Sequence, residues 1–158
     1  MLIVLAASLV LASHPDSRIF NPSFNIELTE DGNDDYISVQ DDDSLDLTDE
    51  ATIAMWIKPR RSQGFGTLLT KGDNFESASN YILYVNKFGN QEQFYVYVGS
   101  GAGSQKVQSN GNLSIGEWNH VAATWNGTTI SVYVDGKHNI SEDQTITPLN
   151  SNGILRIG

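Results

Sequence analysis

Hydrophobic and polar residues alternate with a period of two along most of this chain. Eight short runs show the alternation, are rich in β-branched and aromatic residues, and end at Gly, Asn, Asp or Ser. They are Tyr36–Val39, Thr52–Lys58, Thr67–Lys71, Tyr81–Asn86, Phe94–Val98, Val121–Trp125, Thr129–Val134 and Ile154–Ile157. No segment carries the i, i+3, i+4, i+7 apolar spacing of an amphipathic helix. The pattern therefore predicts an all-β protein, either a sandwich or a barrel.

Two turns between these runs have a well-defined chemistry. Asn126-Gly127 separates Val121–Trp125 from Thr129–Val134, and this dipeptide favours a type I′ hairpin because Asn and Gly accept positive φ angles. Asp135-Gly136 ends the second run with the same chemistry and predicts a reversal toward His138–Ile140. Three consecutive antiparallel strands are therefore expected in this part of the chain.

The N-terminal run Leu2–Ala12 is apolar, as in the hydrophobic region of a signal peptide, and it is too short for a membrane-spanning helix. Small residues follow, so we predict a signal peptide over residues 1–13. No Lys or Arg precedes the run, and a hydrophobic strand or short helix is the alternative interpretation. Residues 14–29 are expected to form an N-terminal strand or a linker.

Length and composition narrow the class of protein. A chain of 158 residues is one domain long, and burial alone suffices to stabilise a core of this size. The chain has no cysteine, which excludes disulfides, thiolate metal sites and a cysteine nucleophile. The net charge of −10, with nine basic residues, argues against binding a nucleic-acid backbone, which requires clustered Lys and Arg.

Two long motifs resemble the signature of laminin-G-like, concanavalin A-like jelly-roll modules. They are LSIGEWNHVAATWNGTTISVYVDGK (Leu113–Lys137) and DDYISVQDDDSLDLTDEATIAMWIKP (Asp34–Pro59). LLTKG (Leu68–Gly72) and LRIG (Leu155–Gly158) fit the same family. The resemblance covers residues 30–158 and implies a single antiparallel β-sandwich domain with the jelly-roll topology.

Members of this family usually continue past the strand that matches Leu155–Gly158 into a closing strand, which pairs across the sheet near the N-terminal strand. An open strand slot would expose a row of backbone donors and acceptors. Three explanations are weighed: the sequence is a fragment lacking its C-terminal strand, the segment Arg18–Leu28 fills the slot, or a neighbouring chain supplies the strand. We favour the first.

The resemblance also implies a possible cofactor, because members of this fold often hold Ca²⁺ through loop carboxylates and carbonyl oxygens. The best local candidates are Asp31, Asn33, Asp34 and Asp35, which precede the first strand of the domain. Their spacing does not match the twelve-residue calcium loop, and solvated loop charge is the alternative. In the adjacent Asp41–Leu47 segment we expect the leucines to pack inward and the acids to face water.

Glycosidases and polysaccharide lyases share this fold, so the fold does not decide whether the chain is an enzyme. The laminarinase-like motif E-x-D-x-x-E and the Q-I/V-H triplet of the alginate lyases are both missing from the sequence. The same holds for the G-x-S-x-G elbow and the zincin motif. Alternation places His120 on one face with Trp118, Ala122 and Thr124, where a structural role is favoured over a general base. The chain is therefore expected not to be an enzyme.

Alternation also assigns several tyrosines to faces that lie opposite the aliphatic side chains. In Phe94–Val98 the rings of Tyr95 and Tyr97 share one face, and we expect Tyr84 and Tyr133 to project outward in the same way. Tyrosine suits sugars, because its ring stacks on the C–H-rich face of a pyranose and its hydroxyl takes a polar partner. The alternative is that tyrosine is simply a good strand residue.

These observations predict a secreted or cell-surface, non-catalytic module that binds a glycan or a cell-surface protein. Tyr84, Tyr95, Tyr97 and Tyr133 are the expected ligand-binding residues. Two alternatives stay open: a structural subunit of an extracellular filament that self-associates by strand exchange, and a fragment of a larger multidomain enzyme or adhesin.

Overall fold

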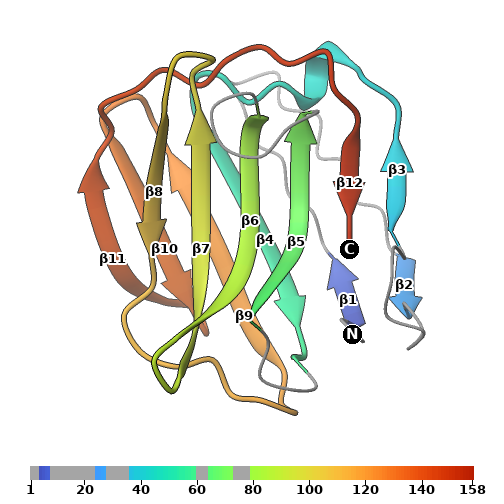
Figure 1. The fold of residues 1–158 in the computed structure, drawn as a ribbon, viewed down its shortest axis with the longest axis vertical. Coiled ribbons are helices and arrows are strands. Elements are labelled where there is room, and N and C mark those ends of the chain that lie inside the picture. Colours follow the sequence, from blue (N-terminus) through green and yellow to red (C-terminus); the bar gives the residue numbers. More distant parts are fainter. Residues whose placement is uncertain (1–3, 8–23, 28–35, 60–63, 73–78) are drawn as a thin grey trace.

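The computed structural model describes residues 4–7, 24–27, 36–59, 64–72 and 79–158. Within these ranges the regular elements are β-strands, apart from one short 3-10 turn, Asp43–Leu45 (η1). The strands form two sheets of six strands each, stacked as two layers (Figure 1). The all-β architecture predicted from the alternation and the antiparallel sandwich implied by the family resemblance are therefore confirmed.

Both sheets are antiparallel at every described pairing. The first has the order β11-β10-β9-β4-β1-β2 and the second has the order β3-β12-β5-β6-β7-β8. The strands of the first sheet are β1 (Val4–Ala7), β2 (Phe24–Glu27), β4 (Ala51–Ile57), β9 (Asn119–Trp125), β10 (Thr129–Val134) and β11 (Lys137–Asp143). Those of the second are β3 (Ile37–Val39), β5 (Phe65–Gly72), β6 (Ser79–Phe88), β7 (Gln91–Gly99), β8 (Ser104–Gln108) and β12 (Leu155–Ile157).

The core lies between the two sheets and is built by the period-two pattern. In β4 the side chains of Ile53, Met55 and Ile57 are buried, and in β7 those of Phe94 and Val96 are buried. Successive side chains of a strand point to opposite faces, so each of these strands directs its apolar set inward and the intervening set outward. Fully burying one such side chain stabilises the fold by about 1.5–3 kcal/mol. The outward set is thereby left to form the two outer faces of the sandwich.

The two predicted turns differ in geometry. Asp135 and Gly136 both have positive φ (51° and 72°), which is the type I′ signature, and they join β10 to β11 as expected. At the other turn Gly127 has φ +80°, whereas Asn126 is not in the left-handed region. The type I′ prediction is wrong there, because the Asn126 side chain closes the turn instead: its Oδ1 accepts hydrogen bonds from the N–H groups of Thr128 and Thr129.

Two strands near the edges were missed or underestimated by the sequence pattern. β8 (Ser104–Gln108) contains one apolar residue, Val107, and it forms the edge of its sheet. β11 (Lys137–Asp143) extends three residues beyond the predicted reversal and forms an edge of the first sheet, on the same side of the sandwich as β8 (Figure 1). An edge strand has a neighbour on one side only and buries fewer side chains: Val107 is the one buried residue of β8, and no residue of β11 is buried. The period-two signal is correspondingly weak in them.

The N-terminal strands lie next to β4. β1 pairs with β4 where Ala6 lies opposite Trp56, and β2 pairs with the other side of β1. Phe24–Glu27 is part of the Arg18–Leu28 segment that we weighed as a slot-filling strand, but it lies beside β1 and not beside β4. The strand at Val4–Ala7 agrees with the alternative interpretation of the N-terminal run, and the signal peptide stays a prediction. In the part of the chain that is described, no helix has the length and apolar character needed to cross a bilayer.

Candidate ligand-binding site

The four tyrosines expected to bind a ligand lie on two different sheets. Tyr84 is in β6 and Tyr95 and Tyr97 are in β7, so these three share the outer face of the second sheet. Tyr133 is in β10 and lies on the outer face of the first sheet. The prediction that all four point away from the core is confirmed, because the residues next to them along their strands pack in the core between the sheets. They nevertheless form two separate surfaces.

The three tyrosines of the second sheet pack on one another. The rings of Tyr84 and Tyr95 are stacked with centroids 4.7 Å apart, and Tyr84 contacts Tyr97 at 5.6 Å. Tyr84 is 4% exposed and Tyr95 is 3% exposed, and Tyr95 Oη donates a hydrogen bond to Gln93 Oε1. Burial raises the pKa of the Tyr95 phenol. The flat faces of these two rings are therefore already occupied, and their role as ligand residues stays a prediction.

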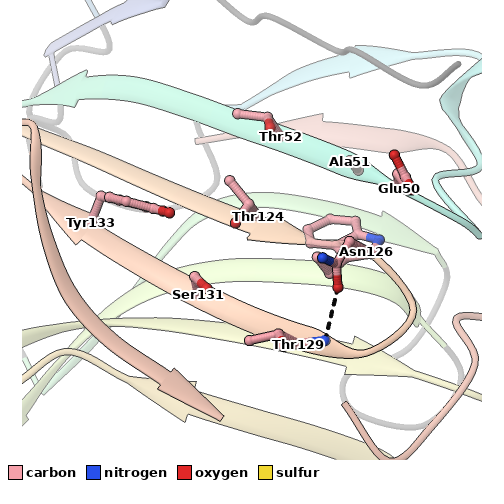
Figure 2. A pocket seen from close by; sticks show the side chains of 9 residues that line it. Glu50, Ala51, Thr52, Thr124, Asn126, Thr129, Ser131 and Tyr133 are labelled. Atoms are coloured by element: carbon pink, nitrogen blue, oxygen red, sulfur yellow. Dashed lines mark hydrogen bonds between the residues drawn. The ribbon is translucent and has the colours of Figure 1, made fainter. Parts of the chain in front are cut away.

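Tyr133 borders a hollow of about 330 Å³ on the outer face of the first sheet. The hollow is lined by Glu50, Ala51, Thr52, Thr124, Trp125, Asn126, Thr129, Ser131 and Tyr133. These residues come from β4, β9 and β10 and from the turns at the ends of these strands. Figure 2 shows the phenol group of Tyr133 directed toward Thr124, with Thr52 and Ser131 on either side. One aromatic ring and several hydroxyl groups thus face the same space.

Four hydroxyl-bearing residues form a row across the sheet, because they are cross-strand partners. Thr52 lies opposite Thr124, Thr124 opposite Ser131, and Ser131 opposite Ser141 of β11. The Oγ atoms of Ser131 and Ser141 are 2.8 Å apart, and Nε2 of His138 is 2.7 Å from Ser141 Oγ. Each hydroxyl is both a donor and an acceptor. The row therefore presents hydrogen-bonding groups at fixed strand spacing.

The neighbouring row combines one aromatic residue with small ones. Tyr133 lies opposite Ala122 of β9, and Ala122 lies opposite Ala54 of β4. On the other side, the imidazole of His138 contacts the Tyr133 ring edge-on, with centroids 5.6 Å apart. Of these four residues, Tyr133 alone lines the hollow, and its neighbours across β9 and β4 are small.

A second aromatic residue lies further along the same face. Trp56 is 45% exposed and its ring contacts the imidazole of His120 at 5.1 Å. Trp56 was not among the ligand-binding residues predicted from the sequence, although the alternation contained the signal: Ile53 and Ile57 are core residues, which directs Trp56 outward. We call the surface formed by Thr52, Trp56, His120, Thr124, Ser131 and Tyr133, together with His138 and Ser141, the β9 face.

The chemistry of the hollow favours binding over bond cleavage by paired carboxylates. A retaining glycosidase needs two carboxyl groups about 5–5.5 Å apart. Among the residues that line the hollow, Glu50 is the one carboxylate. The remaining polar groups include hydroxyls and one amide, so the lining lacks the second carboxylate that this mechanism requires.

A buried lysine lies at one end of the sandwich, away from the β9 face. The side chain of Lys71 is fully buried, and its Nζ lies 2.5 Å from Asp41 Oδ1 and 3.2 Å from Asp46 Oδ1. Lys71 Nζ also donates hydrogen bonds to the carbonyl oxygens of Ser151 (2.5 Å) and Gly153 (2.7 Å). Carboxylates and carbonyls are the ligands that Ca²⁺ takes. This cage does not fit Ca²⁺, because the ammonium group already occupies it.

The cage corrects one expectation about the acidic segment. Leu45 and Leu47 pack inward as predicted, but the prediction that the acids face water is wrong for Asp46, whose side chain is 5% exposed. A buried ammonium requires a counter-charge, which explains why this acid turns inward. The predicted metal ligands Asp31, Asn33, Asp34 and Asp35 lie outside the described residues. Among the residues that are described, no cluster of His, Asp or Glu could hold a metal ion.

Buried polar groups hold the same acidic segment against the core. Tyr81 Oη donates a hydrogen bond to the carbonyl oxygen of Leu45 (3.1 Å), and Trp125 Nε1 donates one to that of Leu47 (3.0 Å). Burial raises the pKa of the Tyr81 phenol well above its usual value near 10.0, and the Asp46 carboxylate acts in the same direction. The segment is thus fixed by contacts with both sheets.

Comparison with known proteins gives a family and a fold. A family model described as the concanavalin A-like lectin/glucanases superfamily (Laminin_G_3) matches residues 31–158. No curated protein matched the sequence. Among solved structures, the chain resembles the CBM40 module of the Ruminococcus gnavus IT-sialidase bound to α2,3-sialyllactose, with a TM-score of 0.59 and 14% identity over 73% of this chain and 66% of that one.

Two further structures show the same fold. Domains LG4-5 of the mouse laminin α1 chain match with a TM-score of 0.56 and 18% identity, over 78% of this chain and 31% of that one. Domain 4 of AbnA, an extracellular arabinanase of Geobacillus stearothermophilus in complex with arabinotriose, matches with a TM-score of 0.57 and 17% identity, over 78% of this chain and 57% of that one. This chain therefore spans less than two thirds of each of these structures.

The motif resemblance, the two antiparallel sheets and the family match agree with one another over nearly the same residues. The chain therefore belongs to the concanavalin A-like lectin/glucanase superfamily, with a jelly-roll domain of the laminin G type.

Proposed function

We propose that this chain is an extracellular carbohydrate-binding module and that it holds its glycan on the β9 face. The observation that carries the proposal is the hollow beside Tyr133, where one aromatic ring adjoins a row of hydroxyl groups. A pyranose has the complementary chemistry, because its C–H-rich face stacks on an aromatic ring while its hydroxyls exchange hydrogen bonds.

The roles of the individual residues follow from their places in the sheet. Tyr133 supplies the stacking surface at the border of the hollow. Thr124 and Ser131 supply hydroxyls at neighbouring strand positions, and Thr52 extends the row. These groups are held by regular strands, so they lose little conformational freedom when a ligand binds.

Two of the similar structures contain a bound sugar, which is α2,3-sialyllactose in one and arabinotriose in the other. Their identity to this chain is low, so they support the proposal by fold and do not transfer a ligand or a site. Secretion and Ca²⁺ remain parts of the same proposal: the family resemblance favours both, and the ion would be held by Asp31, Asn33, Asp34 and Asp35.

The test is a glycan array probed with the purified chain, followed by calorimetry on the best ligand. Tyr133→Ala is expected to weaken binding about five- to thirtyfold, because removing one stacked ring costs about 1–2 kcal/mol including lost contact area. Phe88→Ala is the matched control, since Phe88 is an aromatic residue that is 66% exposed on the other sheet. Binding that tolerates Tyr133→Ala as well as it tolerates Phe88→Ala would disprove the proposed site.

A further inference from the structure

We infer that the β9 face takes uncharged glycans and discriminates against glycans that carry carboxylate or sulfate groups. This inference rests on the proposed function, and it concerns the chemical class of the ligand. It is carried by the distribution of charged side chains around the hollow. One acidic residue lines the hollow and a second lies next to a lining residue, and the cations of the described sheets lie elsewhere.

The first acidic group is Glu50, which lines the hollow just before β4 and is exposed. Figure 2 shows Glu50 at the end of the hollow opposite Tyr133, beyond Thr52. The second is Asp143 of β11, which lies directly opposite the lining residue Thr129. Cross-strand partners share one face of a sheet, so Glu50 lines the space that the ligand would fill and Asp143 lies beside its edge at Thr129.

The cations of the described residues do not offset these carboxylates. Lys71 is buried in its own cage, and Lys87, Lys106 and Arg156 belong to strands of the other sheet. None of the residues lining the hollow is a lysine or an arginine. An anionic sugar placed here would therefore meet negative charge without a compensating partner.

Two lysines lie in or next to the strands of the first sheet, which carries the hollow. Lys137 of β11 lies opposite Val134, which packs against the core, so Lys137 is on the side of the sheet away from the hollow. Lys58 follows β4, six positions beyond Thr52, which corresponds to about 20 Å along a strand. At that distance in a water-like dielectric two opposite charges attract by about 0.2 kcal/mol, which is small beside the repulsion from a nearby carboxylate.

The size of the effect follows from Coulomb's law. Two like charges about 6 Å apart in a water-like dielectric repel by about 0.7 kcal/mol, which is about threefold in affinity. Because Glu50 is exposed, the repulsion should weaken as salt is added. Uncharged hydroxyl-rich sugars experience none of it.

The experiment compares each acidic glycan on an array with its own carboxyl-reduced form, in 20 mM and in 500 mM NaCl. The wild-type chain is expected to bind the reduced form at least about threefold more tightly in low salt, and high salt should narrow the difference. Glu50→Gln should narrow it too. Glu142→Gln is the matched control, because Glu142 lies opposite the core residue Ile130 and so on the other side of β11.

The possible results separate this inference from the proposed function. Acidic glycans that bind as tightly as their reduced forms, or a Glu50→Gln variant that behaves like Glu142→Gln, would overturn the inference while leaving the β9 face as the binding site. Glycan binding that is unaffected by Tyr133→Ala would overturn the proposed function itself. Circular dichroism of each variant confirms that it retains the β-sandwich.

Discussion

Replacing Lys71 by methionine removes the buried ammonium group while keeping a side chain of similar length. The substitution breaks the contacts to Asp41 and Asp46 and the hydrogen bonds to the carbonyl oxygens of Ser151 and Gly153. It leaves the carboxylate of Asp46, which is 5% exposed, without its counter-charge. Removing one partner of a buried ion pair costs about 3–5 kcal/mol, because the other charge stays desolvated.

Urea unfolding measures this cost. A loss of about 4 kcal/mol with an m-value of about 2 kcal/mol/M lowers the midpoint by about 2 M. Since natural domains are stable by about 5–15 kcal/mol, the variant should unfold in far less urea than the wild type. Lys87→Met is the matched control, because Lys87 is exposed near the end of β6. The free energy of unfolding of this variant should stay within about 0.5 kcal/mol of the wild-type value.

A second variant isolates the electrostatic cause. Adding Asp46→Asn to Lys71→Met removes the uncompensated charge, so part of the lost stability should return even though another contact is gone. Two results would contradict this explanation: a free energy of unfolding of Lys71→Met within about 1 kcal/mol of the wild-type value, or a further loss of stability when Asp46→Asn is added. In either case the ion pairs of Lys71 do not stabilise the fold.

Two further predictions concern pH and calcium. Burial and Asp46 raise the pKa of Tyr81, so the unfolded chain loses its phenol proton at lower pH than the folded chain. The stability is therefore fully present below about pH 10 and falls above it by up to about 1.4 kcal/mol per pH unit. Tyr81→Phe should reduce this slope in urea unfolding measured at about pH 9 to 11. That variant should cost about 1 kcal/mol at neutral pH through its lost hydrogen bond to Leu45, and an unchanged alkaline slope would contradict the argument. If Asp34 and its neighbours hold Ca²⁺, a chelator should lower the Tm of the wild type but not that of Asp34→Asn. The expected loss is large, because a ligand at about 100 times its Kd stabilises a protein by about 2.7 kcal/mol. Equal responses of the two proteins would count against the site.

Much of the fold was predictable because its signals are local. The alternation in β4, β7, β9 and β10 decided which side chains face the core, and each of these strands follows it. The Asp135-Gly136 hairpin also follows from two residues and their accessible φ angles. Asn126 shows the limit, because the same dipeptide rule applied there while its side-chain hydrogen bonds closed a different turn.

The candidate site was predictable only in part, because alternation states the face of a residue within its strand and not the sheet to which the strand belongs. Tyr95 and Tyr133 occupy equivalent outward positions, yet one is stacked in a buried cluster and the other borders an open hollow. Trp56 was missed, although its outward position in β4 follows from the same alternation. Whether an outward ring is covered depends on its neighbours across strands, which the sequence does not specify.

By itself the sequence determined the sandwich, the family, the inward faces of the long strands and one tight turn, because each of these depends on residues a few positions apart or on a contiguous motif. Tertiary structure alone decided which outward residues meet. It brought Lys71 to Asp41 and Ser151, which are 30 and 80 positions away, and it placed the hydroxyls of four strands in one row. These contacts depend on strand order and register, which are set by packing the whole chain around one core.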